Sequence, residues 1–252
     1  MWGDLNLRLD NIGFSYSATP VFDGFSLEIP SGRTVLLGPN GAGKSTLLGI
    51  AASVLMPRSG STFVEPERGR RTDSRQRRRY RRQVAWLPQD FCPFPGLTVA
   101  EHVAYCGWLK GMSAGDARAS TGAALEAVDL SSLGDRPVKQ LSGGQRRRMG
   151  LAGALVHDAD VILLDEPTAG LDPLQRERFA ALLRRIEPQK VVVVSTHQTE
   201  DVHDSYGYVA ILDRGVLRFH GTVKDFVSVA SDGIDLRDRV RQAYSRYVVG
   251  EE

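Results

Sequence analysis

The fold is decided by two adjoining stretches, the apolar run Thr34-Val35-Leu36-Leu37 and, directly after it, Gly38-Pro39-Asn40-Gly41-Ala42-Gly43-Lys44-Ser45-Thr46. The first predicts a short buried strand, and a helix is predicted from about Gly43 to Val54. The glycines between them let the backbone wrap closely, so that successive N–H groups and the helix N-terminus face an anion. In this phosphate-loop pattern Lys44 reaches the β- and γ-phosphates while the Ser45 hydroxyl ligates Mg²⁺. A plain glycine-rich turn is the alternative, but the strand before the pattern and the helix after it favour a nucleoside triphosphate site.

Two further apolar runs end in polar side chains that suit the same site. Val161 to Leu164 is followed by Asp165 and Glu166, and Val191 to Val194 is followed by Ser195-Thr196-His197. Such runs are typical of parallel strands buried on both faces, whose carboxyl ends present groups to a ligand. We expect Asp165 to anchor the Mg²⁺ shell and Glu166 to polarise a water for attack on the γ-phosphorus.

The remaining patterns predict an α/β fold of three parts. Alternating residues between Leu5 and Ile29 indicate two antiparallel strands, and helical segments follow one another between Glu101 and His157. The prediction is a P-loop NTPase core with a parallel sheet, an N-terminal antiparallel β subdomain and an inserted α-helical subdomain. The expected division of the single domain 1–252 is a catalytic core at about 1–88 and 159–230, a helical subdomain at 89–158 and a C-terminal helix at 231–252.

Composition excludes several other classes. The chain has 32 basic and 30 acidic residues, a balance that gives no reason to expect specific nucleic-acid binding. No run of about 18 apolar residues predicts a membrane span, and the first residues resemble no signal peptide. With only Cys92 and Cys106, a disulfide framework is excluded, and we expect a cytoplasmic location.

A second glycine motif narrows the class of nucleotide-binding protein that the sequence indicates. Leu141-Ser142-Gly143-Gly144-Gln145 opens the helix before the Asp165 strand, and here the sequence resembles the ATP-binding-cassette family of ATPases, over nearly the whole chain from Tyr16 to Gly221. The motifs occur in the family's order: Gln89 lies 45 residues and Ser142 98 residues after Lys44, and Asp165 lies 23 residues after Ser142. One departure is Gly153, where many relatives have arginine.

The resemblance implies ATP as the ligand and a pair of cassettes, a homodimer, packed head to tail. Ser142, Gly143, Gly144 and Gln145 of one cassette would then cap the γ-phosphate held on the Lys44 loop of the other. It further implies that Tyr16 stacks on adenine, that Gln89 touches Mg²⁺ and the attacking water, that Asp172 communicates across the dimer and that His197 orients Glu166. An aromatic core residue and a structural histidine are the alternatives for Tyr16 and His197.

Spacing within the family restricts the function. The 98 residues between Lys44 and Ser142 leave no room for the long coiled coil of chromosome-maintenance cassettes. The sequence lacks the cysteine clusters of zinc-bearing DNA-repair cassettes. It also holds one cassette, whereas translation-factor cassettes carry two in one chain. What remains is a cassette with a separately encoded transmembrane permease, held by it on the inner face of the cell membrane, or a soluble cassette of iron–sulfur cluster assembly.

Two surface segments bear on the partner. Phe91 to Leu97 is apolar and aromatic where a loop is expected, which is typical of a groove in which a permease docks; filling of the helical subdomain is the alternative. The motifs after Leu97 resemble bacterial drug-export-type cassettes more than importers. The nine arginines from Arg68 to Arg82 are interpreted as a solvated face or loop, with lipid head groups or acidic partner loops as the alternative contact.

Overall fold

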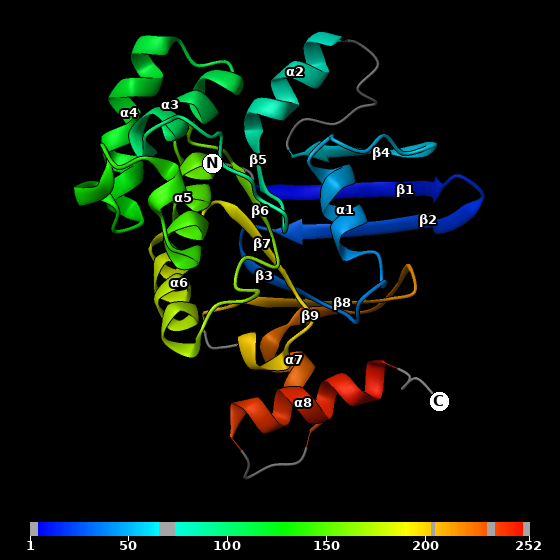
Figure 1. Cartoon of the computed structure of the whole chain (residues 1–252). Coiled ribbons are helices and arrows are strands. Elements are labelled where there is room, and N and C mark those ends of the chain that lie inside the picture. Colours follow the sequence, from blue (N-terminus) through cyan, green and yellow to red (C-terminus); the bar gives the residue numbers. More distant parts are fainter. Residues whose placement is uncertain (1–4, 66–73, 203–204, 231–234, 249–252) are drawn as a thin grey trace.

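The structure is a computed structural model, and it describes residues 5–65, 74–202, 205–230 and 235–248. Two sheets with helices between and around them form the body (Figure 1). The larger sheet has six strands in the order β5-β6-β7-β3-β8-β9, all parallel except β9, which pairs antiparallel with β8. Its strands are β3 (Gly32–Leu37), β5 (Val84–Leu87), β6 (Val161–Asp165), β7 (Val191–Thr196), β8 (Tyr208–Asp213) and β9 (Val216–Thr222).

The smaller sheet is antiparallel, in the order β2-β1-β4. Its strands are β1 (Asn6–Tyr16), β2 (Thr19–Pro30) and β4 (Ser59–Val64). The predicted N-terminal hairpin is therefore present, whereas β4, β8 and β9 had no prediction. Helix α1 (Lys44–Ala51) shares one apolar core with this sheet and with one face of the parallel sheet.

The opposite face of the parallel sheet shares its core with helices α3 to α8 (Figure 1). Because side chains alternate along a strand, Val191 and Val193 enter the core with α1, while Val192 and Val194 enter the core beneath α5 and α6. The helices are α3 (Val99–Leu109), α4 (Ala114–Ala127), α5 (Gly143–Leu155), α6 (Pro173–Arg185), α7 (Val223–Val227) and α8 (Leu236–Tyr247). Three short 3₁₀ turns are Ser131–Leu133, Val138–Gln140 and Thr199–Asp201.

Part of the arginine-rich run Arg68 to Arg82 is a helix and not the expected loop. Residues 74–83 form helix α2 (Ser74–Gln83), which Tyr80 anchors with a buried ring and a hydroxyl that donates to the Ala51 carbonyl at 2.5 Å. The interpretation as a loop is wrong for this part, whereas that as a solvated face agrees with the exposed arginines of α2. Arg68, Arg70 and Arg71 lie outside the described residues. No helix in the described part of the chain is long and apolar enough to span a bilayer.

Candidate active site

The phosphate loop lies at the carboxyl end of β3, the strand between β7 and β8. Gly43 begins helix α1 with a φ of 104°, a conformation that side chains strongly disfavour. At Gly38 a Cβ atom would collide with the Leu212 carbonyl oxygen of β8. Both glycines are therefore required by the close course of the loop, and Ser45 stays exposed at the start of the helix.

Lys44 is buried, with only 5% of its surface exposed. Its Nζ donates to the carbonyls of Gly38 at 2.7 Å and Pro39 at 3.0 Å, and lies 3.8 Å from Oε1 of Glu166. Desolvation lowers the pKa of Lys44, and the carboxylates of Glu166 and Asp165 oppose that effect. The ammonium group thus sits between the loop and the acidic strand end, where it can exchange a carbonyl for a phosphate oxygen.

Asp165 and Glu166 are held by one hydroxyl from the neighbouring strand. Ser195 pairs with Asp165 in the β6–β7 register, and its Oγ donates to Asp165 Oδ1 at 2.6 Å while accepting from the Glu166 N–H at 2.9 Å. Glu166 has a positive φ of 43°, which is costly for a residue with a side chain, by about 1–3 kcal/mol. This strained turn at the strand end directs the buried Glu166 carboxylate towards Lys44 and His197.

His197 contacts Glu166 directly. Its Nδ1 lies 3.0 Å from Glu166 Oε1, and since an ionised carboxylate only accepts, Nδ1 carries the proton. The Gln198 amide Nε2 lies 3.5 Å from His197 Nε2, and Gln198 Oε1 accepts from Arg176. Arg176 also donates to the Leu171 carbonyl at 3.1 Å. A chain of hydrogen bonds therefore runs from the start of α6 to the Glu166 carboxylate.

Tyr16 and Gln89 lie at the rim of the site. Tyr16 is 52% exposed, its hydroxyl is 3.3 Å from Thr46 Oγ1, and its ring packs edge-on against Phe14. It is not a core residue, and its free surface next to the loop suits stacking. Gln89 is exposed just beyond the end of β5, at the same sheet edge. Tyr16 thus contacts the start of α1 through Thr46, whereas Gln89 follows β5, which is separated from β3 by β6 and β7.

The signature motif begins α5, some distance along the chain from the loop. Ser142 caps this helix: its Oγ accepts from the Gln145 N–H at 3.3 Å. In turn, Gln145 Oε1 accepts from the Ser142 N–H at 2.9 Å. Ser142 and Gly143 are exposed, whereas Gly144 is buried against Gln175 of α6. Asp172 caps α6 by accepting from the Gln175 N–H at 2.9 Å. The motif is thus placed beside Asp172, with an outward-facing serine.

Sequence reasoning missed the residues that support this site. Asp201 accepts from Thr196 Oγ1 at 2.6 Å and Thr168 Oγ1 at 3.2 Å, which ties the end of β7 to the segment after Glu166. Ser195 and Arg176 were also not singled out. A polar residue that ends a run of valines, such as Ser195, is the one signal that could have been used, because buried hydroxyls need partners.

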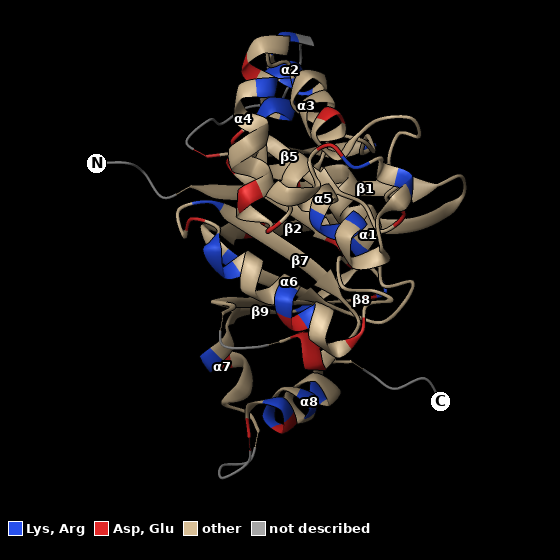
Figure 2. Ribbon diagram, turned by 60° about the vertical axis from the view of Figure 1, so that its left-hand side comes forward, with Lys and Arg blue, Asp and Glu red and all other residues tan. Residues whose placement is uncertain are grey.

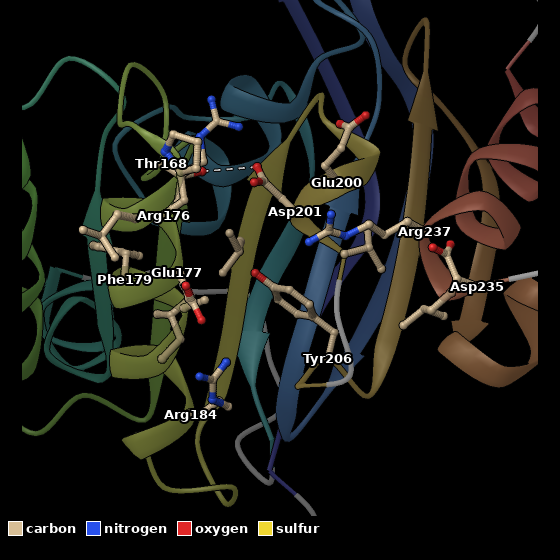
Figure 3. Close-up of a pocket in the computed structure, with 17 residues that line it drawn as sticks. Thr168, Arg176, Glu177, Phe179, Arg184, Glu200, Asp201, Tyr206, Asp235 and Arg237 are labelled. Carbon is tan, nitrogen blue, oxygen red and sulfur yellow. Dashed lines mark hydrogen bonds between the residues drawn. The ribbon is translucent and has the colours of Figure 1, made fainter.

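A hollow of about 960 Å³ lies between α6 and α8 (Figure 3). Thr168, Asp201 and Tyr206 face it, and burial raises the pKa of Tyr206. None of the described residues that line it belongs to the phosphate loop, so this hollow is not the nucleotide site.

Comparisons with known proteins agree with this geometry. The family model described as ABC transporter matches residues 22–169, so the chain belongs to the ABC transporter family. It is an ATP-binding, ATP-hydrolysing cassette of that family. The chain is 36% identical over 83% of its length to the Nod factor export ATP-binding protein I of Paraburkholderia xenovorans, and covers 68% of that protein. It is 33% identical over 92% of its length to the daunorubicin/doxorubicin resistance ATP-binding protein DrrA of Streptomyces peucetius, covering 69% of it.

Importers and a solved dimer also match. The sulfate/thiosulfate import ATP-binding protein CysA of Thermosynechococcus vestitus is 33% identical over 86% of the chain, which covers 64% of that protein. The dimeric cassette MJ0796, solved in a post-hydrolysis state with ADP and Pi, is 26% identical with a TM-score of 0.74, covering 86% of this chain and 98% of that one. Direction of transport is therefore not determined by similarity.

We predict that Ser195→Ala destabilises the protein by about 1–3 kcal/mol, because a buried carboxylate oxygen and a buried N–H both lose their partner. Urea unfolding without nucleotide measures the loss. Ser132→Ala is the control, since Ser132 is exposed and its change should stay within about 0.5 kcal/mol. Equal stability of the two variants would contradict the bridging role.

Proposed function

We propose that this chain hydrolyses ATP to power export through a separate transmembrane permease. The observation that carries the proposal is the meeting of Lys44, Glu166 and His197 at one sheet edge, with Glu166 within 3.0 Å of His197 and 3.8 Å of Lys44. In this proposal Glu166 accepts the proton of the attacking water, Lys44 neutralises phosphate charge and His197 holds the Glu166 carboxylate in place.

Magnesium is the proposed metal cofactor. Ser45 offers an exposed hydroxyl, Asp165 a carboxylate whose Oδ1 accepts from Ser195, and Gln89 an amide oxygen. No group of three or more His, Cys, Asp or Glu within the described ranges forms a metal cluster. Mg²⁺ is usually bound by water and phosphate oxygens beside one or two protein oxygens, which Ser45, Asp165 and Gln89 would supply. Held by these residues, the ion would offset the negative charge of the phosphates.

We predict that Glu166→Gln keeps ATP affinity and lowers turnover by about a hundredfold or more, because the amide retains the shape but cannot accept a proton. Equilibrium ATP binding and steady-state ATPase measure the two effects. Glu177→Gln, an exposed carboxylate on α6, is the control and should leave both unchanged. Near-normal turnover by Glu166→Gln would show that Glu166 does not accept the proton of the attacking water.

The proposed active form is a head-to-tail homodimer. Ser142 and Gly143 are exposed at the start of α5, and this helix end adjoins Asp172 through the contact of Gly144 with Gln175. A serine and free N–H groups at a helix start suit an anion, which in this proposal is the γ-phosphate on the partner's loop. The dimeric state of the similar cassette MJ0796 supports pairing.

We predict that a mixture of two inactive variants regains ATPase. Lys44→Ala removes the phosphate ligand of its own loop, and Ser142→Arg fills the γ-phosphate position of the partner's site. In a mixed dimer one site carries both defects and the other neither, so part of the activity returns. Mixing Lys44→Ala with a Lys44→Ala, Ser142→Arg chain leaves no intact site and is the control. Mixed dimers that form but stay inactive argue against the composite site.

The permease-docking surface is proposed at an aromatic patch on the helical part. Phe94 packs edge-on against Tyr105 at 4.9 Å between ring centres, and Tyr105 stacks with Trp108 at 5.7 Å. Phe94 is 47% and Trp108 53% exposed, so these rings do not fill the interior. Phe91 and Leu97 are half-buried beneath them. An exposed aromatic cluster of this kind suits a protein partner.

Export is proposed because the relatives include proteins named for Nod factor export and drug resistance, and because the motifs after Leu97 resemble exporters. Import, as in the name of CysA, is the second direction. Binding to the permease would place the chain on the inner face of the cell membrane. We also propose the division into a catalytic core at 1–88 and 159–230, a helical subdomain at 89–158 and a C-terminal helix at 231–252. The soluble alternative, iron–sulfur cluster assembly, is separated from transport by the next experiment.

We predict that Phe94→Asp leaves ATP affinity and basal ATPase unchanged but abolishes copurification with a polytopic membrane protein, because the docked state would bury an unpaired charge. Val216→Asp, which replaces another exposed apolar residue (49%), is the control and should retain the partner. Copurification of the unaltered chain with soluble scaffold proteins alone would favour the assembly function, and retention of the permease by Phe94→Asp would remove the patch from docking.

A further inference from the structure

The end of the molecule formed by α2 and the last turn of α3 carries a basic hollow of about 560 Å³. Figure 2 shows the blue of α2 at this end, opposite α8. Its lining, defined here as the basic hollow, consists of Arg77, Arg78, Arg81, Arg82, Leu109, Lys110 and Gly111. Five of these side chains are cationic, and none of the described residues in the lining is acidic.

In the part of the chain that the structure describes, some of the cations of the basic hollow are held by backbone carbonyls. Arg81 donates to the Ser53 carbonyl at 3.1 Å and Arg82 to the Gly111 carbonyl at 3.4 Å. Lys110 Nζ donates to the carbonyls of Val84 at 2.6 Å and Arg81 at 3.1 Å. Within 5–65, 74–202, 205–230 and 235–248, no ion pair to an acidic side chain is found for these residues. Desolvation and the charge of Arg81 both lower the pKa of Lys110.

The chemistry of the anion follows from the side chains. Guanidinium groups bind phosphate oxygens in pairs, and several on successive helix positions present a wide basic surface rather than one small pocket. Leu109, 56% exposed, lines the hollow, and Trp108, 53% exposed, precedes it in α3. Exposed tryptophan and leucine beside arginine and lysine are typical of protein surfaces that lie on a bilayer.

Continuity with the docking patch selects the membrane as the partner. Trp108 stacks on Tyr105, which packs on Phe94, so the aromatic patch and the basic hollow meet along α3. A permease docked at Phe94 is surrounded by lipid, and the basic hollow lies next to it. We propose that the basic hollow binds the phosphate groups of anionic phospholipids and holds the cassette against the membrane surface independently of the permease. Only the choice of the membrane-facing side rests on the proposed docking function.

The test uses the purified full chain and vesicles without a permease. Arg77→Gln with Arg78→Gln removes two charges whose side chains have no hydrogen bond or ion pair among the described residues, so the fold should persist, as circular dichroism and basal ATPase can verify. The unaltered chain should sediment with phosphatidylglycerol vesicles and not with phosphatidylcholine vesicles, and more weakly as salt rises. The double variant should bind about thirtyfold more weakly, from roughly a fivefold loss for each charge near the surface.

The matched control is Arg237→Gln with Arg246→Gln, which removes the same charge from exposed positions on α8 and should bind like the unaltered chain. Equal loss in both variants, or equal binding to the two kinds of vesicle, would overturn the proposal. A further experiment saturates the phosphate loop with a non-hydrolysable ATP analogue and measures binding of inorganic pyrophosphate by equilibrium dialysis. If the chain binds pyrophosphate but no vesicles, the ligand is a soluble phosphate and the proposal is also overturned. Phe94→Asp should still bind vesicles, so failure of permease docking and failure of lipid binding are told apart.

Discussion

The buried ammonium group of Lys44 is the constraint on which the rest of the structure depends. A buried charge is costly unless it is paired and hydrogen-bonded, and here two loop carbonyls and the Glu166 carboxylate supply the partners. The parallel order β6-β7-β3 makes this possible, because it brings the carboxyl ends of the three strands to one edge. The same arrangement leaves an anion-binding loop and an acidic strand end facing each other.

Support for Glu166 comes from two directions. On the neighbouring strand β7, the Ser195 hydroxyl accepts from the Glu166 N–H and donates to the Asp165 carboxylate, and these bonds stabilise the turn with positive φ at Glu166. At the end of the side chain, the Glu166 carboxylate accepts a hydrogen bond from His197. Gln198 contacts His197, and Arg176 donates to Gln198. Arg176 also donates to the Leu171 carbonyl next to Asp172, so hydrogen bonds connect that segment with Glu166.

The outer surface divides into regions of different chemistry. Exposed Ser142 and Asp172 belong to neighbouring helix starts, on α5 and α6, whereas the aromatic rings and the basic hollow lie along α3 and α2. The exposed start of α5 and the aromatic and basic surface along α3 and α2 therefore consist of separate side chains.

The sequence by itself determined the local features: the phosphate loop, the buried runs Val161 to Leu164 and Val191 to Val194 with the polar residues that follow them, the helix that the Ser142 motif opens, and the family. These depend on neighbours in the chain, through periodicity and glycine positions. Only the tertiary structure decided that Ser195 bridges two acids, that Arg176 and Asp201 support the site, and that Arg77 to Arg82 form a helix anchored by Tyr80 and lining a hollow with Lys110. Strand order and helix packing create those contacts between residues far apart in sequence, and no local pattern encodes which distant side chains will meet.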